Sequence, residues 1–357
     1  MRRDFPFDAP AHSAKVVAMK TLLRSAQCLA IATLLAAPLA RAEVNVVEKV
    51  ATDVYFHEGD IGRHGHCNNG WIIFNDYVLV IDANFPSGAQ VILPKIKALT
   101  DKPIRFAFDT HHHGDHAYGN QVMHEAGATI VGHSGVLAEM KKYETNYFTG
   151  KGPGRWEDAA KGRKDVAASK LRPPSVLFDK QLTFDDGTHR VELLHFGVAH
   201  TQGDGWAWLP KERIVFTGDA CVNGPYNYVG DGNIHEWIKT LDHVIALKPL
   251  KVCPAHGPSG GPEVLANQQH YFKSLLAEVK QLKDAGKTAV EVQAASNTIK
   301  ETLRKDDRIA IYIGQFIDAQ VEKAWTEMGG AAFPAKKQAQ AEPVRLKAKE
   351  LVARTGN

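Results

Sequence analysis

The segment His111–His116 constrains the fold most, because histidine occupies four of its six positions and aspartate a fifth. It directly follows residues 104–110, IRFAFDT, which read as a β-strand. In an extended chain residues i and i+2 face the same side, so His111 and His113 can bind one ion while His112 faces away. Gly114 turns the chain and lets Asp115 and His116 reach a second ion. The fold must therefore present a strand end where side chains from elsewhere can complete a metal site.

Three later segments supply residues of the same chemical kind. His200 lies in GVAHTQGD, Asp219 in VFTGDA and His256 in CPAHG. Each stands at or just past the end of a predicted strand. Imidazole and carboxylate groups without a thiolate suit zinc, although iron or manganese would also accept them.

The mature chain alternates strand patterns with helical ones. Predicted strands cover residues 54–59, 69–74, 77–83, 104–110, 129–133, 189–196, 205–210, 213–220 and 251–257. Predicted helices cover residues 88–99, 119–126, 136–147, 234–247, 263–285, 290–303 and 308–328. This order predicts a layered α/β architecture, and neither a fixed-period repeat nor an internal linker divides it.

The four metal-binding segments, taken in order, resemble the metallo-β-lactamase superfamily over roughly residues 46–271. The resemblance implies a four-layer αββα sandwich with two zinc ions at one edge. By that similarity, His111, His113 and His200 would hold one ion, and Asp219 would bridge the pair. Asp115, His116 and His256 would hold the other ion. Diiron oxygen reductases of the superfamily have glutamate where His113 stands here, which favours zinc.

Two such ions with two aspartates and a bridging hydroxide leave a net charge of about +1, which favours small anionic or polar substrates. The ions would lower the pKa of water toward about 7 and supply a hydroxide nucleophile. Asp115 would orient that nucleophile and carry a proton, and is the predicted catalytic residue. Asp82, at the end of strand 77–83, matches an aspartate that supports the ligands in the family; its alternative role is to form a turn.

Residues 1–42 are predicted to be a signal peptide, and Met19 is the favoured start. Lys20 and Arg24 precede an apolar run that ends before Ala40-Arg41-Ala42, so cleavage is expected before Glu43 and the protein is expected in the periplasm or secreted. Arg2-Arg3 offers the alternative of a twin-arginine signal. Residues 43–330 are predicted to form the hydrolase domain with C-terminal helices, and residues 331–357 a basic, disordered tail.

Charge and hydropathy exclude several classes of partner. The leader carries six basic and two acidic residues, so the net charge of +3 becomes −1 without it. No basic surface suggests nucleic acid, and no later segment approaches the roughly 20 apolar residues of a membrane helix. Cysteines do not occur in CxxC spacing. The sequence leaves the oligomeric state open.

The sequence therefore predicts an exported zinc hydrolase that opens an ester, lactone, thioester or amide bond. The best-known zinc β-lactamases carry a cysteine ligand with a lysine three residues later, whereas this chain has Asp219 and Val222. A β-lactamase proper stays an alternative. The others are an enzyme like the mononuclear iron persulfide dioxygenase, using His111, His113 and His200, and a metal-binding relay protein without turnover.

Overall fold

Two β-sheets use consecutive parts of the chain in the computed structural model, which describes residues 44–335. The first sheet contains seven strands in sequence order: β1 (Val47–Ala51), β2 (Val54–His57), β3 (Asn69–Ile73), β4 (Val78–Ile81), β5 (Ile104–Asp109), β6 (Thr129–His133) and β7 (Val176–Phe178). Strands β1 to β4 pair antiparallel, and β4 to β7 pair parallel. The histidine-rich segment His111–His116 therefore follows a central parallel strand, β5.

The second sheet has the order β12-β11-β10-β9-β8. Its strands are β8 (Gln181–Asp185), β9 (Arg190–Leu194), β10 (Trp206–Leu209), β11 (Ile214–Phe216) and β12 (Lys251–Cys253). Only β11 and β12 pair parallel. Strand β12 returns beside β11 after a helical crossover, so residues that follow these two strands meet at one edge of the sheet.

Alternating side chains give the sheets two apolar faces. On β4, Leu79 and Ile81 join the core between the sheets, whereas Val78 and Val80 pack against helices. On β10, Ala207 and Leu209 enter the same central core, and the two tryptophans of this strand face the helices of the other side. The structure thus confirms the αββα sandwich that the sequence predicted.

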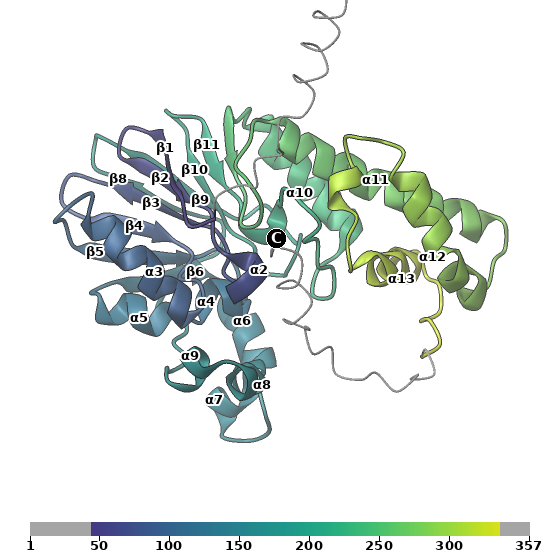
Figure 1. Cartoon of the computed structure of the whole chain (residues 1–357), viewed down its shortest axis with the longest axis horizontal. Coiled ribbons are helices and arrows are strands. Elements are labelled where there is room, and N and C mark those ends of the chain that lie inside the picture. Colours follow the sequence, from purple (N-terminus) through teal and green to yellow (C-terminus); the bar gives the residue numbers. More distant parts are fainter. Residues whose placement is uncertain (1–43, 336–357) are drawn as a thin grey trace, which may run out of the picture. The chain divides into compact units, whose positions relative to one another are not determined.

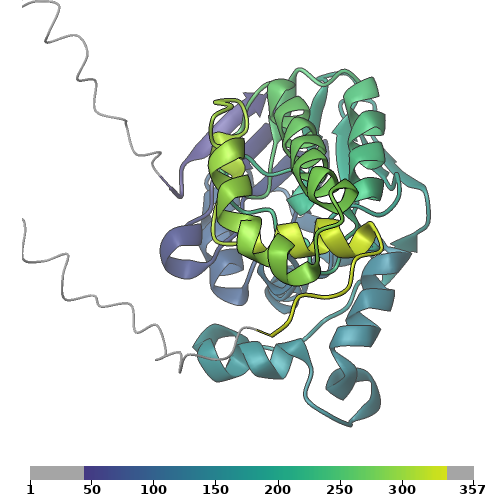
Figure 2. The ribbon, with the colours of Figure 1, turned by 90° about the vertical axis from the view of Figure 1, so that its right-hand side faces the viewer.

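The outer layers consist of the following helices. Helices α3 (Pro86–Lys97) and α5 (Asn120–Glu125) cover the first sheet, and α10 (Ile234–Ala246) and α11 (Glu263–Asp284) cover the second. Helices α12 (Ala289–Leu303) and α13 (Ile317–Glu327) pack against α11. Figure 1 shows α11 to α13 gathered to the right of the sheets, and Figure 2 shows them from that side. The remaining helices are α2 (Ile61–His64), α4 (Gly114–Ala117), α6 (Ser134–Tyr143), α7 (Thr145–Thr149), α8 (Arg155–Gly162), α9 (Lys164–Ala167), η1 (Gly218–Ala220) and η2 (Ala310–Tyr312). Helices α6 to α9 form an insertion between β6 and β7.

One difference from the predicted elements lies near the C-terminus. The expected helix over residues 308–328 is interrupted, because η2 ends at Tyr312 and α13 begins at Ile317. Gly314 lies in the interruption, and a Cβ there would come within 2.6 Å of the Pro225 ring. This close approach brings Phe316 next to the Pro225–Tyr228 loop.

The two ends of the chain carry predictions that the structure does not address. The expected signal peptide lies outside the described residues, as does the expected tail from residue 336 on. Residues 331–335 are described, and the backbone N–H of Phe333 donates to Glu322 of α13. Within residues 44–335 no helix is long and apolar enough to cross a bilayer.

Candidate metal centre

All seven predicted metal ligands meet at one edge of the two sheets. Four come from the segment after β5, which turns into the short helix α4. His200 lies in the loop between β9 and β10, Asp219 lies just past β11, and His256 lies just past β12. Gly218 has a φ of +53°, and a Cβ there would lie 2.4 Å from Thr110 Oγ1. A glycine is thus needed for the loop of Asp219 to approach the loop of His111.

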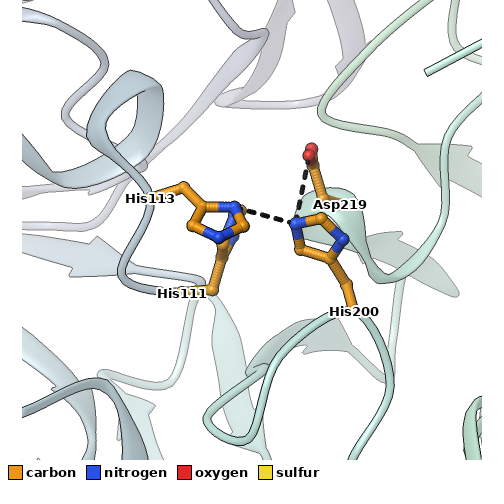
Figure 3. A group of neighbouring side chains, drawn as sticks. All are labelled: His111, His113, His200 and Asp219. Carbon is orange, nitrogen blue, oxygen red and sulfur yellow. Dashed lines mark hydrogen bonds and ion pairs between the residues drawn. The ribbon is translucent and has the colours of Figure 1, made fainter. Parts of the chain in front are cut away.

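The first group consists of His111, His113, His200 and Asp219, whose ligand atoms lie within 4.8 Å of one another. Figure 3 shows the three imidazoles and the carboxylate converging on one point. His113 Nδ1 lies 2.9 Å from His200 Nε2, which lies 3.5 Å from Asp219 Oδ2. Burial is the largest cause that lowers the pKa of His111 and of His200, the latter to about 3, so both rings are neutral and able to bind metal.

The second group consists of Asp115, His116 and His256. His256 Nε2 lies 3.2 Å from both Asp115 Oδ2 and Asp219 Oδ1, and His116 Nε2 lies 3.3 Å from Asp219 Oδ1. Asp219 therefore turns one oxygen to each group. Although burial opposes ionisation, His256 and His116 hold the pKa of the Asp219 carboxyl well below its usual range.

The buried atoms of this centre fit divalent ions. His111 Nε2, His116 Nε2 and Asp219 Oδ1 are buried without a hydrogen bond of regular geometry. Buried polar atoms nearly always have a partner, so unpartnered atoms in both groups are a strong indication of bound ions. Five imidazoles and two carboxylates match the donors that zinc, iron and manganese accept.

Hydrogen bonds behind the ligands fix the orientation of three rings. His116 Nδ1 lies 2.9 Å from Asp82 Oδ2, and His200 Nδ1 lies 2.9 Å from the carbonyl oxygen of Tyr228. Asp82 also accepts bonds from the backbone N–H and the hydroxyl of Thr110. The supporting position predicted for Asp82 is confirmed. Such outer contacts select the tautomer that points the other nitrogen at the metal.

Asp231 supports the third ring and was not found by sequence reasoning. Its Oδ2 lies 2.8 Å from His113 Nε2, while Arg155 binds both of its oxygens at 2.7 and 3.0 Å and Tyr143 donates to Oδ1 at 2.8 Å. Although burial opposes ionisation, the bonds from His113, Arg155 and Tyr143 keep the pKa of Asp231 well below its usual range. One carboxylate thus connects helices α6 and α8 of the insertion to a predicted ligand.

His112 faces away from the two groups, as the alternation of His111, His112 and His113 predicted, although β5 ends at Asp109 and these residues follow the strand. Its buried ring stacks on Tyr143, with ring centres 5.3 Å apart and planes 8° from parallel. Arg155 lies 3.5 Å from the centre of the same Tyr143 ring. His112 is therefore part of the packing between the metal loop and the insertion.

Asp231→Asn is expected to weaken zinc binding about 10- to 100-fold, because the amide replaces an anionic acceptor behind His113. The measurement is a competition titration of zinc against a chelator. Asp185→Asn, which breaks an exposed pair with Arg190, is the matched control and should leave zinc affinity unchanged. Parent-like affinity in Asp231→Asn would show that Asp231 does not position His113.

A pocket of about 750 Å³ opens onto both groups. Apart from the predicted ligands, its walls are largely apolar and aromatic: Ile61, Phe85, Tyr118, Tyr226, Tyr228 and Phe316. Asp115 lines it with a side chain that is 25% exposed, whereas the other predicted carboxylate, Asp219, is 9% exposed. Asp115 is thus the carboxylate more open to a substrate.

The β2–β3 connection contributes Ile61 and Gly62 to this pocket. His64 and His66 of the same segment do not line it, and His66 Nε2 pairs with Ser87 Oγ at 2.9 Å. From helix α8, Arg155 reaches the pocket, while Trp156 packs with Tyr118 in a small apolar cluster.

Comparison with known proteins gives a consistent result. A sequence model of the metallo-β-lactamase superfamily matches residues 62–256. A probable hydroxyacylglutathione hydrolase (glo2) of Schizosaccharomyces pombe is 27% identical over 169 residues, which are 46% of this chain and 53% of that protein. The chain therefore spans about half the length of this curated relative.

Solved structures show a similar fold. A metallo-β-lactamase from Pontibacter korlensis is 19% identical with a TM-score of 0.51, covering 64% of this chain and 98% of its own. The DIM-1 metallo-β-lactamase is 16% identical with a TM-score of 0.51, covering 65% of this chain and 98% of its own. At these identities the likeness concerns the fold alone.

Proposed function

The chain belongs to the metallo-β-lactamase superfamily, and from this premise we propose that it is an exported two-zinc hydrolase that opens a carboxylic ester, lactone, thioester or amide bond. The observation that carries the proposal is the position of Asp219. Its two oxygens lie 3.5 Å from His200 and 3.2 Å from His256, which belong to different groups of donors. A carboxylate placed in this way suits a pair of ions better than a single one.

In this proposal the seven predicted ligands form two sets, one for each zinc ion. His111, His113 and His200 would hold one zinc, Asp115, His116 and His256 the other, and Asp219 both. When bound, the two ions would polarise a carbonyl and lower the pKa of water toward about 7. That chemistry suits acyl transfer to water.

Asp115 is the proposed proton carrier. Its carboxylate lines the pocket, and although burial opposes ionisation, His116 and His256 keep its pKa well below the usual range. It is thus ionised at neutral pH and can accept a hydrogen bond from water in the pocket. Its Oδ2 stays 3.2 Å from His256 Nε2, so the carboxylate that orients the water is itself held in place.

Protein isolated from a periplasmic fraction is expected to begin at Glu43 and to contain about two zinc ions per chain. Intact mass and elemental analysis measure both. One iron per chain without zinc would overturn the hydrolase proposal in favour of oxygen chemistry at His111, His113 and His200.

The matching activity test is a panel of lactones, esters, thioesters, phosphoesters and β-lactams, offered to the zinc-loaded protein. Hydrolysis of carboxylic ester or thioester bonds is expected to exceed that of phosphoesters. When hydroxide attacks a carbonyl carbon, the negative charge develops on a single oxygen, which the two ions can stabilise. Two bound zinc ions with no turnover of any substrate would favour the relay protein. β-Lactam hydrolysis that exceeds all the others would favour the β-lactamase.

A further inference from the structure

The walls of the metal pocket differ in character from its floor. The floor holds the charged groups, namely the predicted ligands His113, Asp115, His200, Asp219 and His256. Above them, Arg155 is the only cationic side chain that lines the pocket in the described part of the chain, and no acidic side chain joins it there. A substrate therefore meets strong charge only where its bond reacts.

Arg155 is already neutralised by a partner within the protein. Its two terminal nitrogens lie 2.7 and 3.0 Å from the two oxygens of Asp231. Recruiting this guanidinium for a substrate carboxylate would leave Asp231 without its main partner, and a paired arginine that is 38% exposed attracts anions only weakly. The walls thus offer no free cation to an anionic substituent.

Two pairs of aromatic rings line the pocket. Tyr118 pairs with Phe85 at 6.1 Å, and its hydroxyl is occupied because it donates to Glu144. Tyr228 pairs with Phe316 at 6.0 Å and also lies 5.7 Å from His113. Both pairs line the pocket that holds the predicted ligands, so an apolar group next to the reacting bond would contact ring surfaces.

The volume exceeds what a small acyl group needs. About 750 Å³ falls within the range of pockets that enclose whole drug-sized molecules. An acetyl or lactoyl group would leave most of the aromatic surface uncovered, whereas an aryl group would cover it and gain hydrophobic contact.

We propose that this pocket selects esters or thioesters whose acyl group bears an aromatic ring and whose other substituent carries no charge. The inference rests on the proposed hydrolase function and adds the substrate class. It predicts discrimination against thioesters of glutathione, whose thiol part carries two carboxylates and one ammonium, and for which the walls provide no unpaired cation.

The test compares thioesters that differ in one part at a time, using zinc-loaded protein. Phenylacetyl thioesters of N-acetylcysteamine and of glutathione share the acyl group, and kcat/KM is expected to be at least about tenfold higher for the neutral one. Acetyl-N-acetylcysteamine is expected to be at least about tenfold poorer than its phenylacetyl counterpart. Equal or faster hydrolysis of the glutathione thioester would overturn the inference.

Phe316→Ala is expected to reduce the preference for phenylacetyl over acetyl, and Phe316→Leu to retain most of it. Phe333→Ala is the matched control, since Phe333 packs against the helices and does not line the pocket. An unchanged phenylacetyl preference in Phe316→Ala would contradict the role given to this wall.

A binding measurement separates this inference from the hydrolase proposal. Uncharged phenylacetamide is expected to bind the metal-free protein in ligand-observed NMR and to lose that binding in Phe316→Ala, whereas acetamide is expected not to bind. If neither thioester is hydrolysed but phenylacetamide binds in this way, the hydrolase proposal fails and the aromatic pocket stands. If phenylacetamide does not bind while the thioesters are hydrolysed, the hydrolase proposal stands and the aromatic pocket fails.

Discussion

Asp219→Asn is expected to lower kcat/KM of the zinc-loaded enzyme by about 10³-fold or more, the largest effect expected of any single substitution here. Asparagine keeps the size of the side chain but removes its charge and one of the two oxygens that face the two groups of donors. His200 and His256 would then belong to sites that share no anion, so one ion should bind more weakly or be lost. Any residual rate should have its optimum at higher pH, because water activated by one ion ionises less readily.

The measurements for Asp219→Asn are zinc stoichiometry and the pH dependence of kcat/KM. Asp76→Asn, an exposed aspartate in the β3–β4 turn, is the control for the loss of one carboxylate. An unchanged pH profile with two zinc ions retained would show that Asp219 is not shared between the ions.

Asp82→Ala is expected to affect both stability and metal binding. Three donors meet the buried Asp82 carboxylate, namely the backbone N–H and hydroxyl of Thr110 and the Nδ1 of His116. Leaving buried donors unpaired costs about 1–3 kcal/mol each, so the free energy of unfolding should fall by about 3 kcal/mol or more. His116 also loses the contact that orients its ring, which should weaken zinc binding about 10- to 100-fold.

Urea unfolding of the metal-free protein and zinc competition measure the two effects of Asp82→Ala separately. Asp82 has a φ of +61°, a conformation that asparagine tolerates and alanine does not. Asp82→Asn should therefore lose less stability than Asp82→Ala, although zinc binding weakens in both. Unchanged stability together with unchanged zinc affinity in Asp82→Ala would show that Asp82 neither stabilises the fold nor orients His116.

The sequence predicted those parts of the fold and site that local patterns encode. The β-branched and aromatic run before His111 is a strand, and the alternate spacing of His111 and His113 brings their rings to the same side. Helix α11 was expected over residues 263–285 and extends over Glu263–Asp284. Apolar periodicity determines such elements, because the residues that carry it are close in the chain.

Contacts between distant residues could not be predicted in this way. Asp231 and His113 are 118 positions apart, and Asp231 lies in an irregular loop whose sequence, VGDGN, reads only as a turn. The edge strands β1, β7 and β8 were missed because few of their residues are buried and the alternation is weak. The interruption before α13 depends on a contact of Gly314 with Pro225, which no local pattern contains.

The division of the predicted ligands between the two sheets has a consequence for when metal can be acquired. His111 to His116 follow a strand of the first sheet, whereas His200, Asp219 and His256 follow strands of the second. Neither set includes all the donors of either ion, so the high-affinity sites exist only after the two sheets have packed together. Once they have formed, each tenfold increase in free zinc raises the free energy of unfolding by about 1.4 kcal/mol per ion. A chain that crosses a membrane unfolded would arrive without its ions and take those of the compartment outside. A chain exported folded, as the alternative signal at Arg2-Arg3 would require, would carry cytoplasmic metal with it.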